Sequence, residues 1–541
     1  MGDAAIEADV LVVGAGLAGI VTALECLRGG LRVTLVERAP AERFGGLAAE
    51  AFGGMALVGT PLQARLRIPD TPELAWQDWL RFGELADDEV WPRAWARHYV
   101  ERSRADVHDW LRGFGVRFMP AVHWVERGRF GDGNSVPRYH LVWGTGHELV
   151  RRLRLALAEA VAASAGGALR VLHGARVDAL DVVGGRVCGA DAVREDGGGR
   201  VALRAGAVVL ACGGLNGGLE QVRANWPAGE AMPRSMLCGA DPASDGRLQQ
   251  WTAAVLRARV TRPGAMWNYA AGIAHPRPRF ANHGLSLIPC KSALWLDHRG
   301  RRIGPEPLVT GFDTRWLCER VTAQAEPWSW QLLNRRIALR ELAISGAEYN
   351  AAIRDRQPLR FALELLLGNR ALLRRLLDES PDVLADATLA GLAARMNARS
   401  GTADVDAGTL QAAADAFDAN FARGASLHND DQLRRVLHAR QWPADRLRTC
   451  RPAPLQRRGD GPFIAIRTQL ITRKSLGGLR TDLDSRVLDA DEQPIDALYA
   501  VGEAAGFGGG GACGRRSLEG TFLPGCILTA RAAARALGGA T

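Results

Sequence analysis

Three glycines near the start of the chain have the spacing of a turn that binds phosphates. They stand as Gly14-x-Gly16-x-x-Gly19, and an acidic residue, Glu37, follows 18 residues after the last of them. In this pattern the first glycine permits a tight turn, the second lets a pyrophosphate approach the backbone, and the third lets a helix lie close to a strand. An acid at this distance accepts hydrogen bonds from ribose hydroxyls. The four residues therefore predict a dinucleotide-binding site.

The segments around these residues fit the elements that such a site needs. An apolar run over residues 10–13 predicts a buried strand, an amphipathic helix follows to about residue 28, and a second apolar strand is expected over residues 33–36. A helix that begins at the glycines directs its unpaired N–H groups and its positive dipole end at the phosphates. A glycine-rich turn without a ligand is the alternative, and the order strand, turn, helix, strand and acid argues against it.

Further glycine-rich stretches favour FAD over NAD as the dinucleotide. One follows the second strand at residues 43–55 (RFGGLAAEAFGGM), where a long dinucleotide would continue past its pyrophosphate. Another closes a buried strand at residues 211–218, and a third begins where a strand over residues 497–501 runs into Gly502 and Glu503. The sequence contains no second GxGxxG unit, which argues against a built-in NAD(P)H domain.

The composition is that of a globular protein in a reducing compartment. The chain has 541 residues, 47% of them hydrophobic, and its net charge of +9 is spread over basic residues interleaved with acidic ones, which argues against nucleic-acid binding. The nine cysteines form no C-x-x-C pair, so the sequence gives no sign of a metal site. The N-terminus has neither a signal peptide nor a run that could span a bilayer. We expect a cytoplasmic protein without membrane insertion, whose partner is a small molecule.

The sequence pattern changes between residues 240 and 459, and we expect this segment to be a second domain inserted into the first. It begins irregular and rich in Pro, Trp and His, and then becomes mainly helical. Its stretch 359–380 (LRFALELLLGNRALLRRLLDES) is compatible with a membrane-surface helix, but its mixed charges favour a packed helix with a solvated face. The two parts of the first domain are then residues 1–239 and 460–541.

Several stretches outside the glycine motifs resemble one superfamily, the fumarate reductase and 3-ketosteroid dehydrogenase flavoproteins. The similarity runs over nearly the whole chain and implies an α/β fold with non-covalent FAD. In that fold a Rossmann-like (GR2-type) FAD-binding domain is split in the sequence by an inserted α+β capping or substrate domain. The stretches that carry the resemblance are residues 134–146 (NSVPRYHLVWGTG), 470–479 (LITRKSLGGL), 481–488 (TDLDSRVL) and 518–526 (LEGTFLPGC).

The motifs and the resemblance together name the residues expected to contact FAD. Glu503 is expected on the ribityl chain, and the last helix is expected to direct its N-terminus at the flavin pyrimidine. A helix terminus supplies positive charge for the N1 side of reduced flavin. The expected cofactor-binding residues are Gly14, Gly16, Leu17, Ala18, Glu37, Arg38, Gly45, Gly46, Val177, Ala211, Gly213, Gly502, Glu503, Gly520, Thr521 and Phe522.

The resemblance implies desaturation of a C–C bond next to a carbonyl, in which a base takes the α proton and flavin N5 takes the β hydride. In ketosteroid dehydrogenases, tyrosines carry out the proton transfer. The first choice here is Tyr139, because its segment borders the flavin in the family, and Tyr269 is the second choice. A buried aromatic residue with a satisfied hydroxyl is the alternative for each. Lys474 and Arg515 are candidates for binding a carboxylate or stabilising an enolate, with a solvated charge as the alternative for Lys474.

Two further hypotheses concern the reaction. The first is the reverse direction, an ene-reductase of the fumarate reductase type fed by an external electron donor. Lys474 stands where fumarate reductases place a substrate-binding histidine, so the reduction of a small dicarboxylate is disfavoured. The second is an FAD-dependent structural or RNA-associated protein without substrate chemistry. Tryptophan-rich segments favour an apolar substrate, although such residues also form cores, and Cys513 is expected to be a small residue that fills tight space.

Overall fold

The chain folds into two compact units, and each unit is built from segments that are separate in the sequence. We describe a computed structural model, in which residues 6–164, 166–516 and 518–538 are placed. The first unit consists of Met1–Ala228, Ala240–Trp267 and Lys474–Thr541, and the second consists of Gly229–Gly239 and Asn268–Arg473.

Strands and helices alternate along much of the first unit. Its helices are α1 (Leu17–Arg28), α2 (Gly46–Glu50), α3 (Pro61–Arg65), α4 (Pro72–Gly83), α5 (Val90–Arg102), α6 (Trp110–Gly113), α7 (Thr145–Ala163), α8 (Leu219–Ala224), α9 (Arg247–Leu256) and α19 (Phe522–Ala536). Its strands are β1 (Ile6–Val13), β2 (Val33–Glu37), β3 (Gly54–Ala56), β4 (Phe118–His123), β5 (Tyr139–Val142), β6 (Leu169–His173), β7 (Ala175–Val183), β8 (Arg186–Arg194), β9 (Arg200–Leu210), β11 (Val260–Thr261), β19 (Gly478–Leu479), β20 (Arg486–Leu488) and β21 (Pro494–Ala500). The predicted strand–helix–strand order at the N-terminus is confirmed by β1, α1 and β2.

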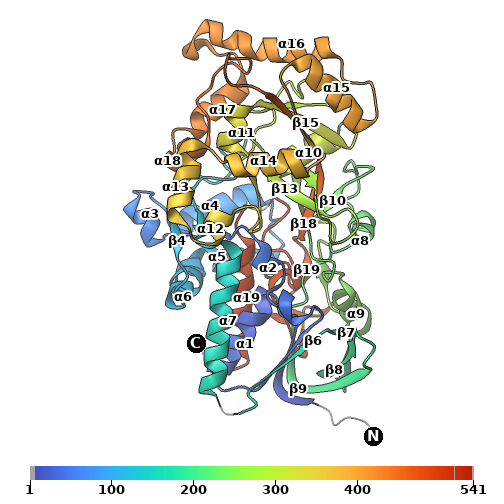
Figure 1. The fold of residues 1–541 in the computed structure, drawn as a ribbon. Coiled ribbons are helices and arrows are strands. Elements are labelled where there is room, and N and C mark those ends of the chain that lie inside the picture. The colour runs from blue at the N-terminus through green and yellow to red at the C-terminus, as the bar shows by residue number, and fades with distance from the viewer. Residues whose placement is uncertain (1–5, 165, 517, 539–541) are drawn as a thin grey trace. The chain divides into compact units, whose positions relative to one another are not determined.

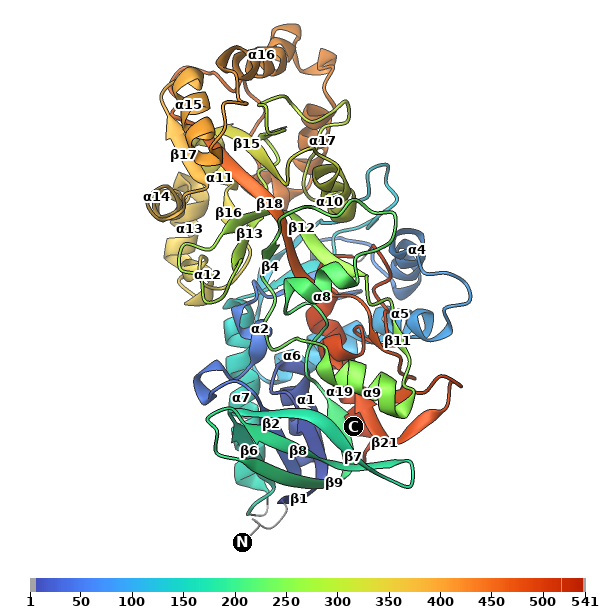
Figure 2. The same ribbon diagram turned by 90° about the vertical axis from the view of Figure 1, so that its right-hand side faces the viewer.

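The main sheet of the first unit has the strand order β20-β21-β9-β1-β2-β6. Its neighbouring strands from β21 to β6 are parallel, and β7 and β8 extend the sheet from β9 as an antiparallel hairpin (Figure 2). Helices α1, α7 and α19 lie side by side (Figure 1) and share one core with Val10 and Val12, whereas Leu11 and Val13 belong to a second core. Both faces of β1 are therefore buried, which explains its unbroken apolar run.

The parallel strands of this sheet end in one row. Val13 of β1 pairs with Val36 of β2 and with Leu210 of β9, and Leu210 pairs in turn with Ala500 of β21. The residues that follow these four are brought to the carboxyl edge of the sheet. Ligands of open parallel sheets bind at this edge, and three of the four glycine-rich segments of the sequence begin there.

The second unit is built around another sheet. Its strand order is β14-β15-β18-β12-β13-β16, and β10 and β17 also pair with β18. The strands are β10 (Leu237–Cys238), β12 (Met266–Ala274), β13 (Gly284–Ile288), β14 (Leu294–Leu296), β15 (Trp328–Asn334), β16 (Ala343–Ile344), β17 (Val383–Asp386) and β18 (Phe463–Ser475). The helices are α10 (Thr314–Thr322), α11 (Arg335–Glu341), α12 (Ala351–Arg354), α13 (Pro358–Leu367), α14 (Arg370–Glu379), α15 (Leu389–Ser400), α16 (Ala407–Asp418), α17 (Asp431–Ala439) and α18 (Pro443–Arg448).

The boundaries of the units differ from the expected boundaries at both ends of the insertion. Residues 240–267 belong to the first unit, where α9 packs on β7. Residues 460–473 belong to the second unit, because β18 pairs with β15, β17 and β10. The sequence pattern of the segment indicated mainly helices in its later part and did not locate this sheet, whereas the resemblance implied an α+β domain. Among the placed residues, no helix combines the length and the hydropathy that spanning a bilayer requires.

Candidate functional site

The first glycine motif forms a turn that leaves open space at one position. Gly14 has a φ of 105°, and a Cβ added to it would lie 2.4 Å from the Ala211 carbonyl oxygen. A Cβ on Gly19 would lie 1.9 Å from the Gly14 carbonyl oxygen, so this residue allows α1 to lie against the turn. By contrast, a Cβ on Gly16 would meet no atom within 4 Å. Two of the glycines therefore serve the fold, whereas the third leaves room for a ligand.

A pair of glycines from the next glycine-rich segment, Gly45 and Gly46, lies beside this open space. The Gly45 amide donates to the Ala15 carbonyl oxygen at 3.0 Å, and a Cβ on Gly46 would lie 3.1 Å from the Gly16 Cα. Helix α1 begins directly after Gly16, and neither a side-chain hydrogen bond nor an acidic residue caps its first turn. Its unpaired N–H groups and open approach fit the pyrophosphate of a dinucleotide such as FAD.

Glu37 stands at the end of β2 with its carboxylate over the same turn. Its two oxygens accept from the backbone N–H groups of Ala15 and Ala39, each at 2.7 Å. A carboxylate has about four acceptor positions, so two remain for ribose hydroxyls. The neighbouring Arg38 pairs with Glu195 and Asp245, each at 3.0 Å, and this engagement gives its guanidinium a structural role.

Glu503 joins three segments at the carboxyl edge of the sheet. Its carboxylate accepts from the Ser475 amide at 2.8 Å, and the Ser475 hydroxyl oxygen accepts from the Leu215 amide at 3.1 Å. A Cβ on Gly214 would lie 2.3 Å from the same carboxylate. The segments after β9, β18 and β21 are thus held together where the ribityl chain is predicted.

The other predicted cofactor residues lie on the elements that surround this edge. Leu17 and Ala18 begin α1, and the Ala18 side chain lies against Gly502, whose added Cβ would approach it to 2.9 Å. Gly213 has a φ of 80° beside Ser244. Val177 is buried on β7 in the second core of this unit. Their contacts with FAD stay predictions.

Tyr139 begins β5 and lies against the loop that leads into α19. A Cβ on Gly54 would lie 1.8 Å from its hydroxyl oxygen, and a Cβ on Gly520 would lie 2.9 Å from its ring. These two glycines leave the space that the tyrosine ring occupies. Burial raises the pKa of the Tyr139 hydroxyl well above its usual range, and the negative charge of Glu519 raises it further. The hydroxyl therefore stays protonated to a higher pH than that of an ordinary tyrosine.

Charged and aromatic side chains gather at the start of α19. The Trp267 indole N–H donates to the Glu519 carboxylate at 2.9 Å, and the Lys474 ammonium lies 4.3 Å from the centre of the Phe522 ring. The rings of Trp267 and Phe522 are 5.8 Å apart. The structure thus connects Tyr139 and Lys474 through α19. Sequence reasoning missed Glu519 as a functional candidate, although it stands inside the LEGTF stretch that carried part of the resemblance.

His140, the residue after Tyr139, is held as a neutral imidazole. Burial lowers its pKa to about 3. Its Nδ1 lies 2.7 Å from the Arg138 carbonyl oxygen and donates to it, so Nε2 accepts from the Thr60 hydroxyl at 2.8 Å. A neutral histidine fixed at both nitrogens supports β5 and supplies no positive charge to the site.

Arg138, the residue before Tyr139, is buried between two carboxylates. Its guanidinium pairs with Asp70 at 2.9 Å and with Asp78 at 2.5 Å, and both carboxylates are enclosed. Asp78 also accepts from the Ser135 amide at 2.9 Å and from the Ser135 hydroxyl at 2.8 Å. This network fixes the segment that enters β5 and so determines where Tyr139 lies.

Replacing Asp78 with asparagine is expected to lower the free energy of unfolding by about 3–5 kcal/mol, because it leaves a buried arginine charge partly unpaired. Urea denaturation followed by circular dichroism measures the change. Glu101→Gln is the matched control, since Glu101 pairs with Arg97 in an exposed i,i+4 pair, and its loss should cost less than about 1 kcal/mol. Equal effects of the two substitutions would show that the buried network does not hold this segment.

The remaining candidates lie in the loop before α19 or in the other unit. Arg515 is exposed, and its amide donates to the Gly83 carbonyl oxygen at 3.0 Å. Tyr269 lies half-buried on β12 of the second unit. Cys513 is buried with its sulfur 3.4 Å from the Thr521 hydroxyl, as a small residue in a tight space. Their roles toward a substrate stay predictions.

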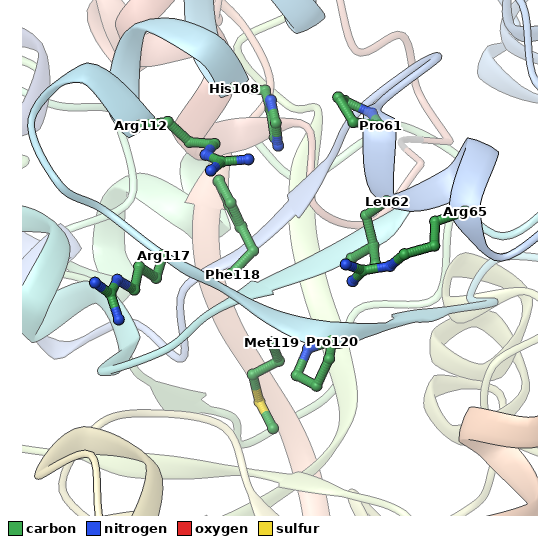
Figure 3. Close-up of a pocket in the computed structure, with 9 residues that line it drawn as sticks. All are labelled: Pro61, Leu62, Arg65, His108, Arg112, Arg117, Phe118, Met119 and Pro120. Carbon is green, nitrogen blue, oxygen red and sulfur yellow. The ribbon is translucent and has the colours of Figure 1, made fainter.

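A cavity of about 400 Å³ opens in the first unit beside α3, α6 and β4 (Figure 3). Figure 3 shows the side chains of Arg65 and Arg112 directed toward its middle, whereas the Arg117 side chain points away from them. Its apolar lining includes Leu62 and Phe118. Of the residues that the structure describes in this lining, none is a predicted cofactor or catalytic residue.

Comparisons with known proteins show one consistent relationship. The model of the family described as FAD binding domain matches residues 9–523. The chain is 40% identical over 558 aligned positions to a KsdD-like steroid dehydrogenase of Mycobacterium tuberculosis, and the alignment covers 98% of this chain and 95% of the relative. Among solved structures, it is similar to the 3-ketosteroid Δ1-dehydrogenase of Sterolibacterium denitrificans, with a TM-score of 0.66 and 18% sequence identity. The alignment covers 98% of this chain and 99% of that structure. The 3-ketosteroid-Δ4-(5α)-dehydrogenase of Rhodococcus jostii gives a TM-score of 0.65 at 21% identity, and the alignment covers 98% of this chain and 97% of that structure. The mixed α/β fold is therefore that of flavoprotein dehydrogenases.

Proposed function

We propose that this chain, which belongs to the FAD binding domain family, is a dehydrogenase that desaturates a C–C bond beside the carbonyl group of a steroid. The family relationship makes it an FAD-dependent oxidoreductase that acts on CH–CH groups. The steroid skeleton is inferred from the KsdD-like relative, which aligns over 98% of this chain. The observation that carries the proposal is the protonated Tyr139 hydroxyl, held against the loop that leads into α19 and beside the charge of Glu519.

The first unit is proposed to be a Rossmann-like FAD-binding domain of the GR2 type, and the second unit its capping or substrate domain. FAD supplies a hydride acceptor when it is bound. The open space over Gly16 and the uncapped start of α1 support a pyrophosphate there, and the two remaining acceptor positions of Glu37 support a ribose. None of the proposed contacts requires a covalent link, so we propose non-covalent binding.

Tyr139 is proposed to bind the substrate carbonyl. Its hydroxyl is protonated at neutral pH, as that of an ordinary tyrosine is, and burial and Glu519 raise its pKa further, so it is suited to donate a hydrogen bond to the carbonyl oxygen. Negative charge develops on that oxygen as the α proton leaves, and a fixed donor stabilises it. The Lys474 ammonium, which lies over the Phe522 ring, adds positive charge at the start of α19.

Glu519 is proposed to accept the α proton. A tyrosine that donates its proton in a hydrogen bond cannot accept the α proton through that same hydroxyl, so a second group is needed. The Glu519 carboxylate is half-buried and is oriented by the indole of Trp267. The α carbon would then lose its proton to the Glu519 carboxylate, and bound FAD would supply the acceptor for the hydride of the β carbon, so that a C=C bond would form between the two carbons.

Anaerobic mixing of the FAD-loaded protein with a saturated 3-ketosteroid tests this function. We expect loss of the yellow flavin absorbance and formation of the unsaturated ketone. The matched control is the same skeleton with a hydroxyl in place of the ketone, which should not bleach the flavin because nothing acidifies the α proton. Reoxidation of the pre-reduced protein by enones, without bleaching by saturated ketones, would instead establish the ene-reductase direction. Absence of a reaction in both directions would contradict substrate chemistry of either kind.

A further inference from the structure

Helix α13 of the second unit exposes a row of leucines. None of its ten residues is buried. The exposed fractions are 81% for Leu359, 55% for Leu363, 76% for Leu366 and 62% for Leu367. Because their spacings are four, three and one, these residues share one face of the helix. A contiguous exposed apolar face marks an interaction surface rather than scattered surface leucines.

The neighbouring helix shows that leucine content alone does not produce this exposure. Helix α14 follows after Gly368 and Asn369, and it buries Leu372, Leu373 and Leu376. The predicted packed helix with a solvated face is therefore confirmed for α14. For α13 that prediction was wrong, since its apolar face is solvated. The leucines of α13 are thus not covered by the helices of the second unit.

The charges around α13 are mainly positive. Residues 356–374 contain four arginines and one glutamate. Arg360 pairs with that glutamate, Glu364, at 3.0 Å. Arg370 and Arg374 are exposed, and in the part of the chain that the structure describes their guanidinium groups engage no carboxylate. An apolar helix face that is followed in the chain by exposed arginines matches the chemistry of an anionic lipid surface.

We propose that α13 docks this protein on the surface of a membrane that contains anionic lipids. The four leucines enter the boundary between head groups and acyl chains, and Arg370 and Arg374 contact the lipid phosphates. A second copy of the chain fits this face less well. A stable protein interface buries about 800 Å² on each partner. A helix of ten residues is only about 15 Å long and offers much less surface than that.

Vesicle co-sedimentation of the full-length FAD-loaded protein tests this docking. We expect binding to vesicles of phosphatidylcholine and phosphatidylserine, much weaker binding to phosphatidylcholine alone, and a decrease as salt is raised, because salt screens the charges. The double substitution Leu363→Gln and Leu366→Gln should weaken binding at least tenfold. Leu437→Gln with Leu447→Gln is the matched control, since these leucines are also exposed but lie on α17 and α18, and it should leave binding unchanged.

A second variant separates the charge contribution from the apolar contribution. Arg370→Gln with Arg374→Gln should reduce binding to the anionic vesicles several-fold and leave the weak binding to phosphatidylcholine unaltered. Urea unfolding and FAD content, measured in parallel, should match the wild type for every variant, because all these side chains are exposed. The proposal is overturned if the wild type does not sediment with anionic vesicles, or if the Leu363 and Leu366 variant binds as the wild type does. It is also overturned if light scattering shows a dimer that only this variant disrupts, since the occupant is then a second copy.

Discussion

Replacing Tyr139 with phenylalanine is expected to slow flavin reduction by a saturated 3-ketosteroid about a hundredfold, because the substitution removes one preorganised donor to the developing enolate. Phenylalanine keeps the ring that fills the space left by Gly54 and Gly520, so the fold and the bound FAD should be unaffected. Stopped-flow measurement of the anaerobic absorbance loss gives the rate constant. The steroid concentration that gives half the maximal rate should change much less than the rate itself.

Tyr499→Phe is the matched control for this experiment. Tyr499 is also a partly buried tyrosine of the first unit, but it lies on β21, and its replacement should leave the rate of bleaching unaltered. Glu519→Gln tests the proposed proton acceptor and should slow bleaching by a similar factor, because the amide keeps the shape of the carboxylate but not its basicity. A wild-type rate in Tyr139→Phe would remove this residue from the mechanism and make Tyr269 of the second unit the next tyrosine to test.

The elements that the sequence predicted well are those whose signals are local. The first strand, helix and second strand, with Gly14, Gly16 and Gly19 between them, lie within the first 37 residues. Gly19 is required by Gly14, five residues away, and Gly14 by Ala211 at the end of β9, whereas Gly16 meets no neighbour. The unbroken apolar run over residues 10–13 indicates a buried strand directly. Hence the pattern alone located β1, α1 and β2 and the open position at Gly16.

The contacts that the sequence could not predict join residues far apart in the chain. Arg138 pairs with Asp70 and Asp78, which precede it by 68 and 60 residues, and no local pattern reports that these charges are buried together. Glu519 is held by Trp267, which precedes it by 252 residues. A charged residue in an isolated sequence looks solvated, and only the tertiary fold shows which charges are enclosed.

The second unit illustrates a different limit. Its central strand, β18, is 13 residues long and was assigned by sequence to the FAD domain, because the change in composition near residue 460 looked like a domain boundary. Residues 463–469 of this strand pair with β15, and residues 463–466 also pair with β17. Pairing partners determine to which unit a strand belongs, and composition does not report them.

Replacing Gly16 with alanine is expected to weaken FAD binding about a hundredfold while the apoprotein remains folded. The added methyl would meet no atom within 4 Å in the protein, and Gly16 has a φ of −71°, which any residue adopts. It would instead enter the space proposed for the pyrophosphate, where an overpacked contact costs about 3 kcal/mol, equivalent to about a hundredfold in affinity. Fluorescence titration of the apoprotein with FAD measures the dissociation constant, and urea denaturation should show an unfolding free energy within about 1 kcal/mol of the wild type.

Gly19→Ala separates a glycine that serves the ligand from one that serves the fold. Its methyl would lie 1.9 Å from the Gly14 carbonyl oxygen, so α1 must move away from the turn, and we expect the apoprotein itself to lose about 3 kcal/mol of stability. Gly113→Ala adds the same methyl at a helical position where nothing lies within 4 Å, so it should leave FAD affinity unchanged and alter the stability by no more than about 1 kcal/mol. If Gly16→Ala bound FAD with wild-type affinity, the pyrophosphate would lie elsewhere, and the open space at Gly16 would not be its site. If it instead lost stability as Gly19→Ala does, the space would be needed for the fold itself, and an effect on FAD would follow from unfolding rather than from contact.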